Sequence, residues 1–276
     1  MRAEELTVQF GVAGILDFVE TEHGLVKAMI SLDGMVGELY LQGAQLTGWA
    51  PAGERAVLFT SPNSAFAPGR AIRGGIPIIF PWFGASRQAP AAPQHGFART
   101  APWQLDGVET AGREALTLTF SLADAAVGSA FWPEPFRAIC TVTFASTLSL
   151  RLAVQNRAAH PILFEEALHT YFAISDIADV AVSGLAGTTY IDKTDAAKRK
   201  PQTAPHVIIA AETDSVYLDT PRQCAIEDRG WHRRIVIEKA GAASSVVWNP
   251  WAEKAAAMAD LGDPAWRNMI CVEAGN

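Results

Sequence analysis

Apolar and polar residues alternate with a period of two through the middle of the chain. Between residues 116 and 122, apolar residues stand at the even positions and Thr or Ser at the odd ones. Residues 138–144 and 148–154 repeat the pattern, with residues 145–147 between them. Successive side chains of a strand point to opposite faces, so each run places one apolar row on one face of a sheet. The pattern predicts half-buried strands, and the short break predicts an antiparallel hairpin.

Further strand-like runs occur along the chain and are separated by Gly, Pro, Asn and Asp. Only residues 252–261 predict a helix, because this Ala-rich run with Glu and Lys consists of good helix formers. Asn249 is expected to cap this helix, Pro250 to take its first position and Gly262 to end it. The further strand-like runs are residues 25–32, 57–60, 162–175, 207–210, 226–228 and 235–238.

Many short strands and one short helix argue against a fold in which strands and helices alternate regularly. We therefore predict an all-β fold, an antiparallel β-sandwich of two large packed sheets with a few short helices. The nearest approach to a linker is the Ala- and Pro-rich run 88–94, which is too short to separate domains. A single domain over residues 1–276 is expected, and no repeat of 20 to 50 residues points to a propeller or a solenoid.

Composition narrows the classes of function. Of the 276 residues, 49% are hydrophobic and 18% charged, which excludes a disordered chain. The net charge of -7 argues against nucleic acid as a partner, because such binding depends on Lys and Arg. Cys140, Cys224 and Cys271 form no CxxC pair, so neither a disulfide framework nor a thiolate zinc site is expected. The acidic N-terminal segment and the lack of a long apolar run predict a cytoplasmic protein without a membrane partner.

Arg73 interrupts an otherwise apolar segment, residues 71–84, that is rich in Gly and Pro. The adjacent Gly74 and Gly75 let the backbone approach another chain or a ligand closely, and a guanidinium beside them can hold an anion through two N–H groups. A buried Arg is more often paired with a structural carboxylate. The segment alone leaves both interpretations open, an anion site and an internal ion pair.

Residues 93–99, PQHGFAR, bring an amide, an imidazole and a guanidinium into one loop as Gln94, His95 and Arg99. Binding groups concentrate in loops that a rigid scaffold positions. A single His is more often a structural residue than a catalyst, so the neighbours of His95 are what favour a binding loop.

His169 and Glu273 are the candidates for proton transfer. His169 lies in a strand-like run, and an imidazole with a pKa near its ordinary value of about 6.5 serves as acid or base around neutral pH. A structural core His explains that run equally well. Glu273 follows an apolar run near the end of the chain, where a functional group requires the tail to be paired into a sheet. The alternative for Glu273 is an exposed terminal side chain.

Several other mechanisms lack their sequence signatures. The chain contains no GxGxxG after a strand, no GxxxxGK[ST], no HExxH and no GxSxG. Its six His residues show no close pair with the spacing of metal ligands. A metal held jointly by the distant His95 and His169 stays open as an alternative.

Taken together, five separated segments resemble the hexose-6-phosphate mutarotases (glucose-6-phosphate 1-epimerases) of the aldose 1-epimerase superfamily. The resemblance spans residues 71 to 276 in order, and a set of motifs is more specific than any one of them. Residues 1–50 add only a strand-like pattern. The segments are IRGGIPIIFPWFG, PQHGFART, LHTYF, VVWNPWAEKAAAMADLGD and MICVEAGN.

The resemblance implies a galactose-mutarotase-like β-sandwich that binds a sugar in a cleft on one sheet, without a metal or an organic cofactor. It implies that His169 is the general acid and Glu273 the general base. Trp82 stands where the family often has another residue, so the sugar-contacting surface is expected to differ there. The implied substrate contacts are Arg73, Gln94, Arg99 and Asp219, with His95 close to the ring oxygen.

The expected reaction is the interconversion of the α and β anomers of a hexose 6-phosphate, glucose 6-phosphate first among them. Removal of a proton from the anomeric hydroxyl, with supply of one to the ring oxygen, opens the ring, and closure on the other face gives the second anomer. Arg73 and Arg99 would hold the phosphate of this small-molecule partner. The alternatives are an epimerase of unphosphorylated sugars and a non-catalytic carbohydrate-binding module. A monomer is compatible with the sequence, which leaves the oligomeric state open.

Overall fold

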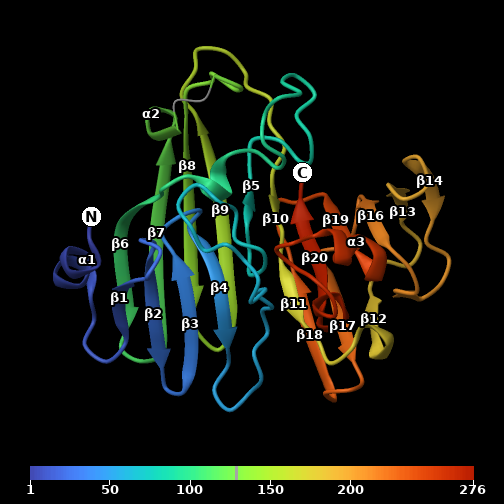
Figure 1. The fold of residues 1–276 in the computed structure, drawn as a ribbon, viewed down its shortest axis with the longest axis horizontal. Coiled ribbons are helices and arrows are strands. Elements are labelled where there is room, and N and C mark those ends of the chain that lie inside the picture. The colour runs from blue at the N-terminus through green and yellow to red at the C-terminus, as the bar shows by residue number, and fades with distance from the viewer. Residues whose placement is uncertain (128–129) are drawn as a thin grey trace. The chain divides into compact units, whose positions relative to one another are not determined.

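The computed structural model describes residues 1–127 and 130–276, which form two compact units (Figure 1). The N-terminal unit comprises residues 1–56, 65–72 and 76–166. The C-terminal unit comprises residues 57–64, 73–75 and 167–276. The expectation of a single domain over residues 1–276 stays a prediction.

The N-terminal unit contains two four-stranded antiparallel sheets, in which consecutive strands are neighbours. The first sheet consists of β1 (Leu16–Glu20), β2 (Val26–Leu32), β3 (Met35–Tyr40) and β4 (Gln45–Ala50). The second consists of β6 (Gln104–Ala111), β7 (Ala115–Ala123), β8 (Phe136–Phe144) and β9 (Leu148–Asn156). The unit also holds β5 (Ile78–Ile79), the helices α1 (Ala3–Phe10) and α2 (Asp124–Val127), and the 3₁₀ turn η1 (Ala98–Thr100).

The alternation of apolar residues is realised in the second sheet of the N-terminal unit. Buried residues occupy every second position of β7 and β8, as period two predicts. Phe144 pairs with Leu148, so the predicted hairpin has the expected three-residue loop. A Cβ added to Gly37 of β3 would lie 2.5 Å from Cε1 of Phe144, which shows that the two sheets pack face to face at close range.

The C-terminal unit also contains two antiparallel sheets. In the larger one the strands follow the order β14 (Lys198–Pro201), β13 (Thr189–Asp192), β16 (Thr213–Leu218), β19 (Ser244–Asn249), β20 (Met269–Gly275) and β10 (Ala167–Leu168), with β11 (Tyr171–Ala173) also paired to β20. The smaller one follows the order β15 (His206–Ile208), β12 (Val180–Ser183), β17 (Gln223–Asp228) and β18 (Arg233–Glu238). The helix α3 (Trp251–Ala257) and the 3₁₀ turns η2 (Ile177–Asp179) and η3 (Ala265–Asn268) complete the unit.

The last strand, β20, lies inside the larger sheet of the C-terminal unit (Figure 1). Its first five residues are all buried, because β19 flanks it on one edge and β10 and β11 on the other. Val272 pairs with Val247 and donates its N–H to the carbonyl of Thr170. The tail is therefore held in a sheet, as a functional Glu273 requires, and the alternative of an exposed terminal Glu is wrong.

The prediction of an all-β antiparallel sandwich with a few short helices is confirmed, but several details differ. The strands form two sheets in each unit rather than two large ones, because period two fixes which face of a strand is buried and not which strands pair. The run 162–175 holds only β10 and β11, and the backbone of Glu165 bonds instead to the carbonyl of Pro81. Residues 57–60 form only isolated bridges, Leu58 with Phe172 and Thr60 with Gly74.

The helices also depart from expectation at their ends. The predicted helix 252–261 is α3, which ends at Ala257 because Met258 adopts an extended conformation. Asn249 accepts a hydrogen bond from the N–H of Trp251 at 2.9 Å, close to its expected capping role. Helix α1 was not predicted, although Glu5 accepts hydrogen bonds from the backbone N–H and the guanidinium of Arg2 at its start. None of the helices in the described part of the chain is long and apolar enough to cross a membrane.

Candidate active site

His169 and Glu273 face each other across neighbouring strands of the C-terminal unit. Leu168 pairs with Ala274 and Tyr171 with Cys271, so the same register places His169 directly opposite Glu273. Nδ1 of His169 lies 3.3 Å from Oε1 of Glu273. The exposed fractions of the two side chains are 9% and 1%. The two residues predicted to transfer protons are thus brought together in a site that excludes most water.

The second carboxylate oxygen of Glu273 has an unusual environment. Oε2 is buried and receives no hydrogen bond from any residue that the structure describes. Burial raises the pKa of Glu273 well above its ordinary value, the negative charge of Asp214 acts in the same direction, and the positive charge of Lys193 opposes them. A carboxylate with a raised pKa is a stronger base when ionised, and a buried acceptor without a donor is suited to a hydroxyl supplied by a ligand.

Aromatic side chains fix the surroundings of His169. The ring of Tyr171 stacks on the imidazole, with centroids 4.8 Å apart and an angle of 9° between the planes. The ring of Trp248 meets the imidazole edge to face at 6.0 Å and 84°. Register places Tyr171, Cys271 and Trp248 in one row across three strands, next to the row of Glu273. The imidazole therefore has rigid neighbours on two sides.

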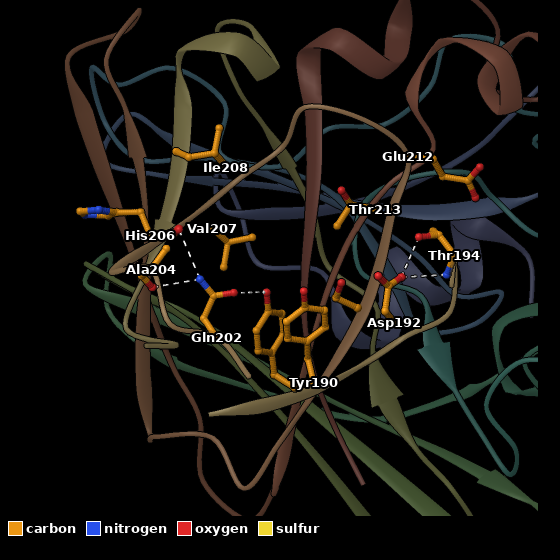
Figure 2. A pocket seen from close by; sticks show the side chains of 12 residues that line it. Tyr190, Asp192, Thr194, Gln202, Ala204, His206, Val207, Ile208, Glu212 and Thr213 are labelled. Carbon is orange, nitrogen blue, oxygen red and sulfur yellow. Dashed lines mark hydrogen bonds between the residues drawn. The ribbon is translucent and has the colours of Figure 1, made fainter. Parts of the chain in front are cut away.

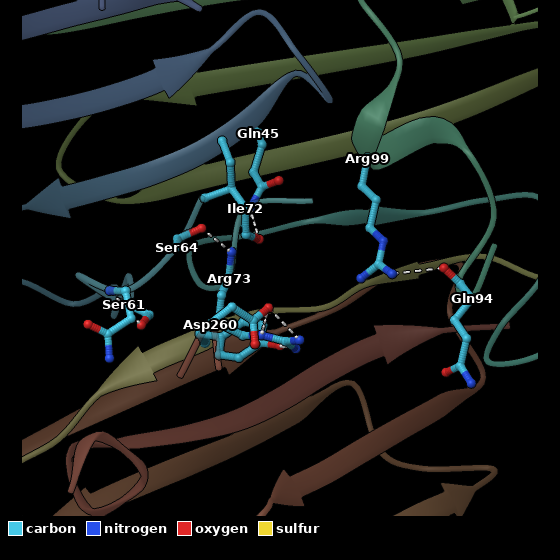
Figure 3. Close-up of polar contacts among 10 residues, drawn as sticks. Gln45, Ser61, Ser64, Ile72, Arg73, Gln94, Arg99 and Asp260 are labelled. Atoms are coloured by element: carbon cyan, nitrogen blue, oxygen red, sulfur yellow. Dashed lines mark hydrogen bonds and ion pairs between the residues drawn. The ribbon is translucent and has the colours of Figure 1, made fainter. Parts of the chain in front are cut away.

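Arg73 is linked to this row through Tyr171. Its Nη1 donates to the hydroxyl oxygen of Tyr171 at 3.0 Å, while Nε and Nη2 contact Oδ2 of Asp260 at 3.0 and 2.9 Å (Figure 3). Asp260 is therefore an internal carboxylate partner of Arg73, which was one of the two interpretations that the sequence left open. Three of the five guanidinium N–H groups are directed at these two residues, which leaves two for a ligand.

The glycine beside Arg73 confirms the expected close backbone approach. Gly74 has a φ of 118°, which non-glycine residues rarely adopt, and a Cβ there would collide with the backbone of Phe59 and Thr60. The N–H of Arg73 donates to Oγ of Ser64 at 3.0 Å, and its carbonyl accepts from the N–H of Ser61. The guanidinium thus projects from a backbone that is held on both sides.

The loop 93–99 belongs to the N-terminal unit and is held by internal contacts. Nη2 of Arg99 donates to the carbonyl of Gln94 at 2.8 Å (Figure 3). The N–H of Gly84 donates to Nδ1 of His95 at 3.2 Å, so neutral His95 carries its proton on Nε2. Trp82 is buried and donates from Nε1 to the carbonyl of Pro93 at 2.9 Å. Trp82 therefore anchors the predicted binding loop through its indole N–H.

Two aspartates belong to the β16 segment, of which Asp219 was expected to contact the substrate and Asp214 was not singled out from the sequence. Asp219 is exposed in the turn after β16, and its predicted role as a substrate contact stays a prediction. Asp214 pairs with Trp248, and Trp248 pairs with Cys271, so these three side chains share one face of the sheet. Glu273 lies two residues after Cys271 in β20, so it is on the same face as Asp214. Sequence reasoning missed Asp214, because its place on this face depends on the pairing of β16 with β19 and of β19 with β20.

A pocket of about 380 Å³ opens on the other face of β16 (Figure 2). Ser215 and Tyr217 line it, and they alternate along the strand with Asp214. Its polar groups bind one another: Tyr217 donates to Oε1 of Gln202 at 3.1 Å, and Asp192 accepts two hydrogen bonds from Thr194. This pocket is separate from the His169–Glu273 pair.

Among residues 1–127 and 130–276, no group of three or more His, Cys, Asp or Glu side chains is arranged to hold a metal ion. The described site offers instead an imidazole, a buried carboxylate and a guanidinium within one unit, joined through Tyr171. Such a set can move protons and hold a polar or anionic ligand.

Comparisons with known proteins agree with this chemistry. A family model described as aldose 1-epimerase matches residues 29–276. A protein of Cenchrus ciliaris, provisionally named glucose-6-phosphate 1-epimerase, is 35% identical over 93% of this chain and 80% of its own length. A protein of Escherichia coli (strain K12) with the same provisional name is 37% identical over 94% of this chain and 82% of its own length. The crystal structure of a provisionally named mutarotase from Salmonella typhimurium has a TM-score of 0.90 and 32% identity, and covers 96% of this chain and 88% of its own.

Proposed function

Because the chain belongs to the aldose 1-epimerase family, we propose that it interconverts the α and β anomers of a hexose 6-phosphate, with glucose 6-phosphate as the first substrate to test. The names of the two relatives described above support the phosphorylated substrate. The observation that carries the proposal is the His169–Glu273 pair, with its buried carboxylate oxygen that no described residue hydrogen-bonds.

Glu273 acts as the base in the proposed reaction. We assign Oε2 to the anomeric hydroxyl, because a substrate O–H would supply the missing donor. Transfer of that proton to Glu273 leaves electrons on O1 that form the C1=O1 double bond as the bond from C1 to the ring oxygen breaks. The raised pKa of Glu273 increases its affinity for this proton.

His169 acts as the acid. Nδ1 faces Glu273, so we assign the opposite nitrogen, Nε2, to the ring oxygen, which takes the proton as the C1–O5 bond breaks. Rotation about the C1–C2 bond turns the aldehyde over. Closure then uses the same residues with exchanged protonation: His169 removes the proton from the O5 hydroxyl, and Glu273 returns one to O1. Each positioned proton transfer contributes about 10² to 10⁴ in rate.

The guanidinium groups are the proposed phosphate contacts. Arg73 keeps two N–H groups beyond those directed at Asp260 and Tyr171, and guanidinium groups bind phosphate oxygens through paired N–H donors. For Arg99, the role as a phosphate contact stays a prediction. The roles of Gln94, His95 and Asp219 as further substrate contacts are likewise predictions that single variants can test.

One observation favours a second candidate, an aldose 1-epimerase that acts on unphosphorylated sugar. The carboxylate of Asp260 offsets the positive charge of Arg73, which lowers the attraction of this guanidinium for a second anion. In that case Arg73 would serve as the internal ion-pair partner of Asp260 and would not hold phosphate.

Exchange NMR on glucose 6-phosphate and on glucose distinguishes the two candidates. The proposal predicts that wild type accelerates anomer exchange of glucose 6-phosphate more than that of glucose, and that Arg73→Ala slows only the phosphorylated sugar. Arg113→Ala is the matched control, since Arg113 pairs with Asp33 on an exposed surface. Equal acceleration of both sugars, unaffected by Arg73→Ala, would favour the unphosphorylated substrate. Calorimetric binding without any exchange would identify a non-catalytic binding module.

A further inference from the structure

Tyr171 connects the proposed proton-transfer pair to the proposed phosphate contact. It is buried, with 2% of its surface exposed, in a cluster with Trp248, Met269 and Cys271. Its ring stacks on His169, while its hydroxyl accepts a hydrogen bond from Nη1 of Arg73 at 3.0 Å. Tyr171 thus contacts both His169, the proposed acid, and Arg73, the proposed phosphate contact.

The ring of Tyr171 determines the plane of the imidazole. With the two rings 9° from parallel and Trp248 edge-on to the same imidazole, rotation of the His169 ring would collide with one neighbour or lose contact with the other. The orientation of the ring sets the direction in which each nitrogen points. Proton transfer depends steeply on that direction, since a displacement of about 1 Å costs about 10²-fold in rate.

The hydroxyl of Tyr171 acts on Arg73 instead. Asp260 contacts Nε and Nη2, on one edge of the guanidinium, and the Tyr171 hydroxyl contacts Nη1. Together the two partners hold the guanidinium plane at two points. Loss of the hydroxyl would leave the ion pair but allow the plane to rotate about it.

We propose that Tyr171 is a positioning residue with two separable effects: its ring orients His169 for proton transfer, and its hydroxyl orients Arg73 for the substrate. This inference rests on the proposed function for its kinetic part. Its structural part concerns only the orientation of the two side chains, so it can be measured whether or not the chain is active.

Two variants separate the effects. Tyr171→Phe keeps the ring and removes the hydroxyl, so we expect KM for glucose 6-phosphate to rise about tenfold, the effect of about one hydrogen bond to a charged group, with kcat within about twofold of wild type. Tyr171→Leu removes the ring, so we expect kcat to fall about 10²-fold for any sugar that wild type converts. Proton NMR should show the NOE contacts between the His169 imidazole and the Trp248 ring unchanged in Tyr171→Phe, and lost in Tyr171→Leu because the imidazole is no longer held in its plane.

Tyr217 provides the matched control. It is buried in the same unit, packs against the tilted ring of Tyr190 with centroids 5.0 Å apart, and donates its hydroxyl proton to Gln202. It points, however, to the other face of the sheet. Tyr217→Phe and Tyr217→Leu should leave kcat, KM and the His169 resonances unchanged. Thermal unfolding of all four variants measures the general cost of removing a buried tyrosine.

Three outcomes would decide the proposal. Equal kcat losses in Tyr171→Leu and Tyr217→Leu would overturn it, because a general loss of stability would then explain both. Unchanged NOE contacts between the His169 imidazole and Trp248 in Tyr171→Leu would also overturn it, with or without activity. If wild type converts no hexose or hexose phosphate, the proposed function fails, whereas loss of the NOE contacts between the His169 imidazole and Trp248 in Tyr171→Leu would still support the positioning role.

Discussion

Nδ1 of His169 lies 3.3 Å from Oε1 of Glu273, in direct register between the two short strands β10 and β11 and the last strand, β20. The pair depends on backbone hydrogen bonds that tie the end of the chain into a sheet. Because the register holds the two side chains opposite each other, changes to β20 that leave both residues in place should still affect the reaction.

Removal of residues 274–276 tests this dependence. Ala274 and Gly275 pair with β10 and β19, and Asn276 bonds to the backbone of Ala243 and Gly241. We expect the truncated protein, which retains His169 and Glu273, to lose about 10²-fold in kcat for glucose 6-phosphate, because Glu273 is no longer held on its C-terminal side. Deletion of Met1 at the other end is the control. Full activity of the truncated protein would show that β20 needs no support beyond Glu273.

The pH dependence of activity reports the charges around Glu273. The base must be ionised to accept a proton, and its pKa is raised by burial and by Asp214, so kcat/KM should increase with pH through a limb above 4.5, its ordinary value. Asp214→Asn removes a negative charge and should move this limb to lower pH. Lys193→Gln removes a positive charge and should move it to higher pH. Shifts of both variants in the same direction would contradict the assignment of the limb to Glu273.

Gly96 controls the stability of the loop that holds Gln94, His95 and Arg99. Gly96 and Gly84 both have a φ of 71°, but a Cβ on Gly96 would overlap the carbonyl of Phe80, whereas a Cβ on Gly84 would meet nothing within 4 Å. Gly84→Ala should therefore cost about 1–2 kcal/mol of unfolding free energy, from the left-handed backbone alone. Gly96→Ala should cost more, roughly 3 kcal/mol or above. Denaturant unfolding measures both, and equal losses would show that the loop relaxes around the added methyl group.

The local elements of the fold could be predicted from the sequence where a pattern is contained in one segment. The hairpin of β8 and β9 follows from period two and a three-residue break, and Gly74 was expected to allow a close backbone approach. The end of α3 could not be predicted from its Ala-rich run, because helix propensity alone does not show that Met258 becomes extended.

The candidate site depended on pairings between distant segments, which no local pattern contains. His169 and Glu273 were identified by their chemistry and by a family resemblance, but their contact results from the register of β10 and β11 on β20. Asp260, the partner of Arg73, lies after α3, far from Arg73 in the sequence. The sequence alone therefore could not decide whether Arg73 forms an internal ion pair or an anion site. Asp214 was missed because its place on the same face of the sheet as Glu273 results from the pairing of β16 with β19 and of β19 with β20.

The most direct test of the account is the rate of anomer exchange of glucose 6-phosphate, measured by exchange NMR, for wild type and Glu273→Gln. Gln keeps the size of the side chain but cannot accept the proton, so we expect the enzymatic rate to fall by about 10² to 10⁴. Glu253→Gln, on the exposed side of α3, should retain the wild-type rate. Equal rates for wild type and Glu273→Gln would contradict the central claim that Glu273 is the base.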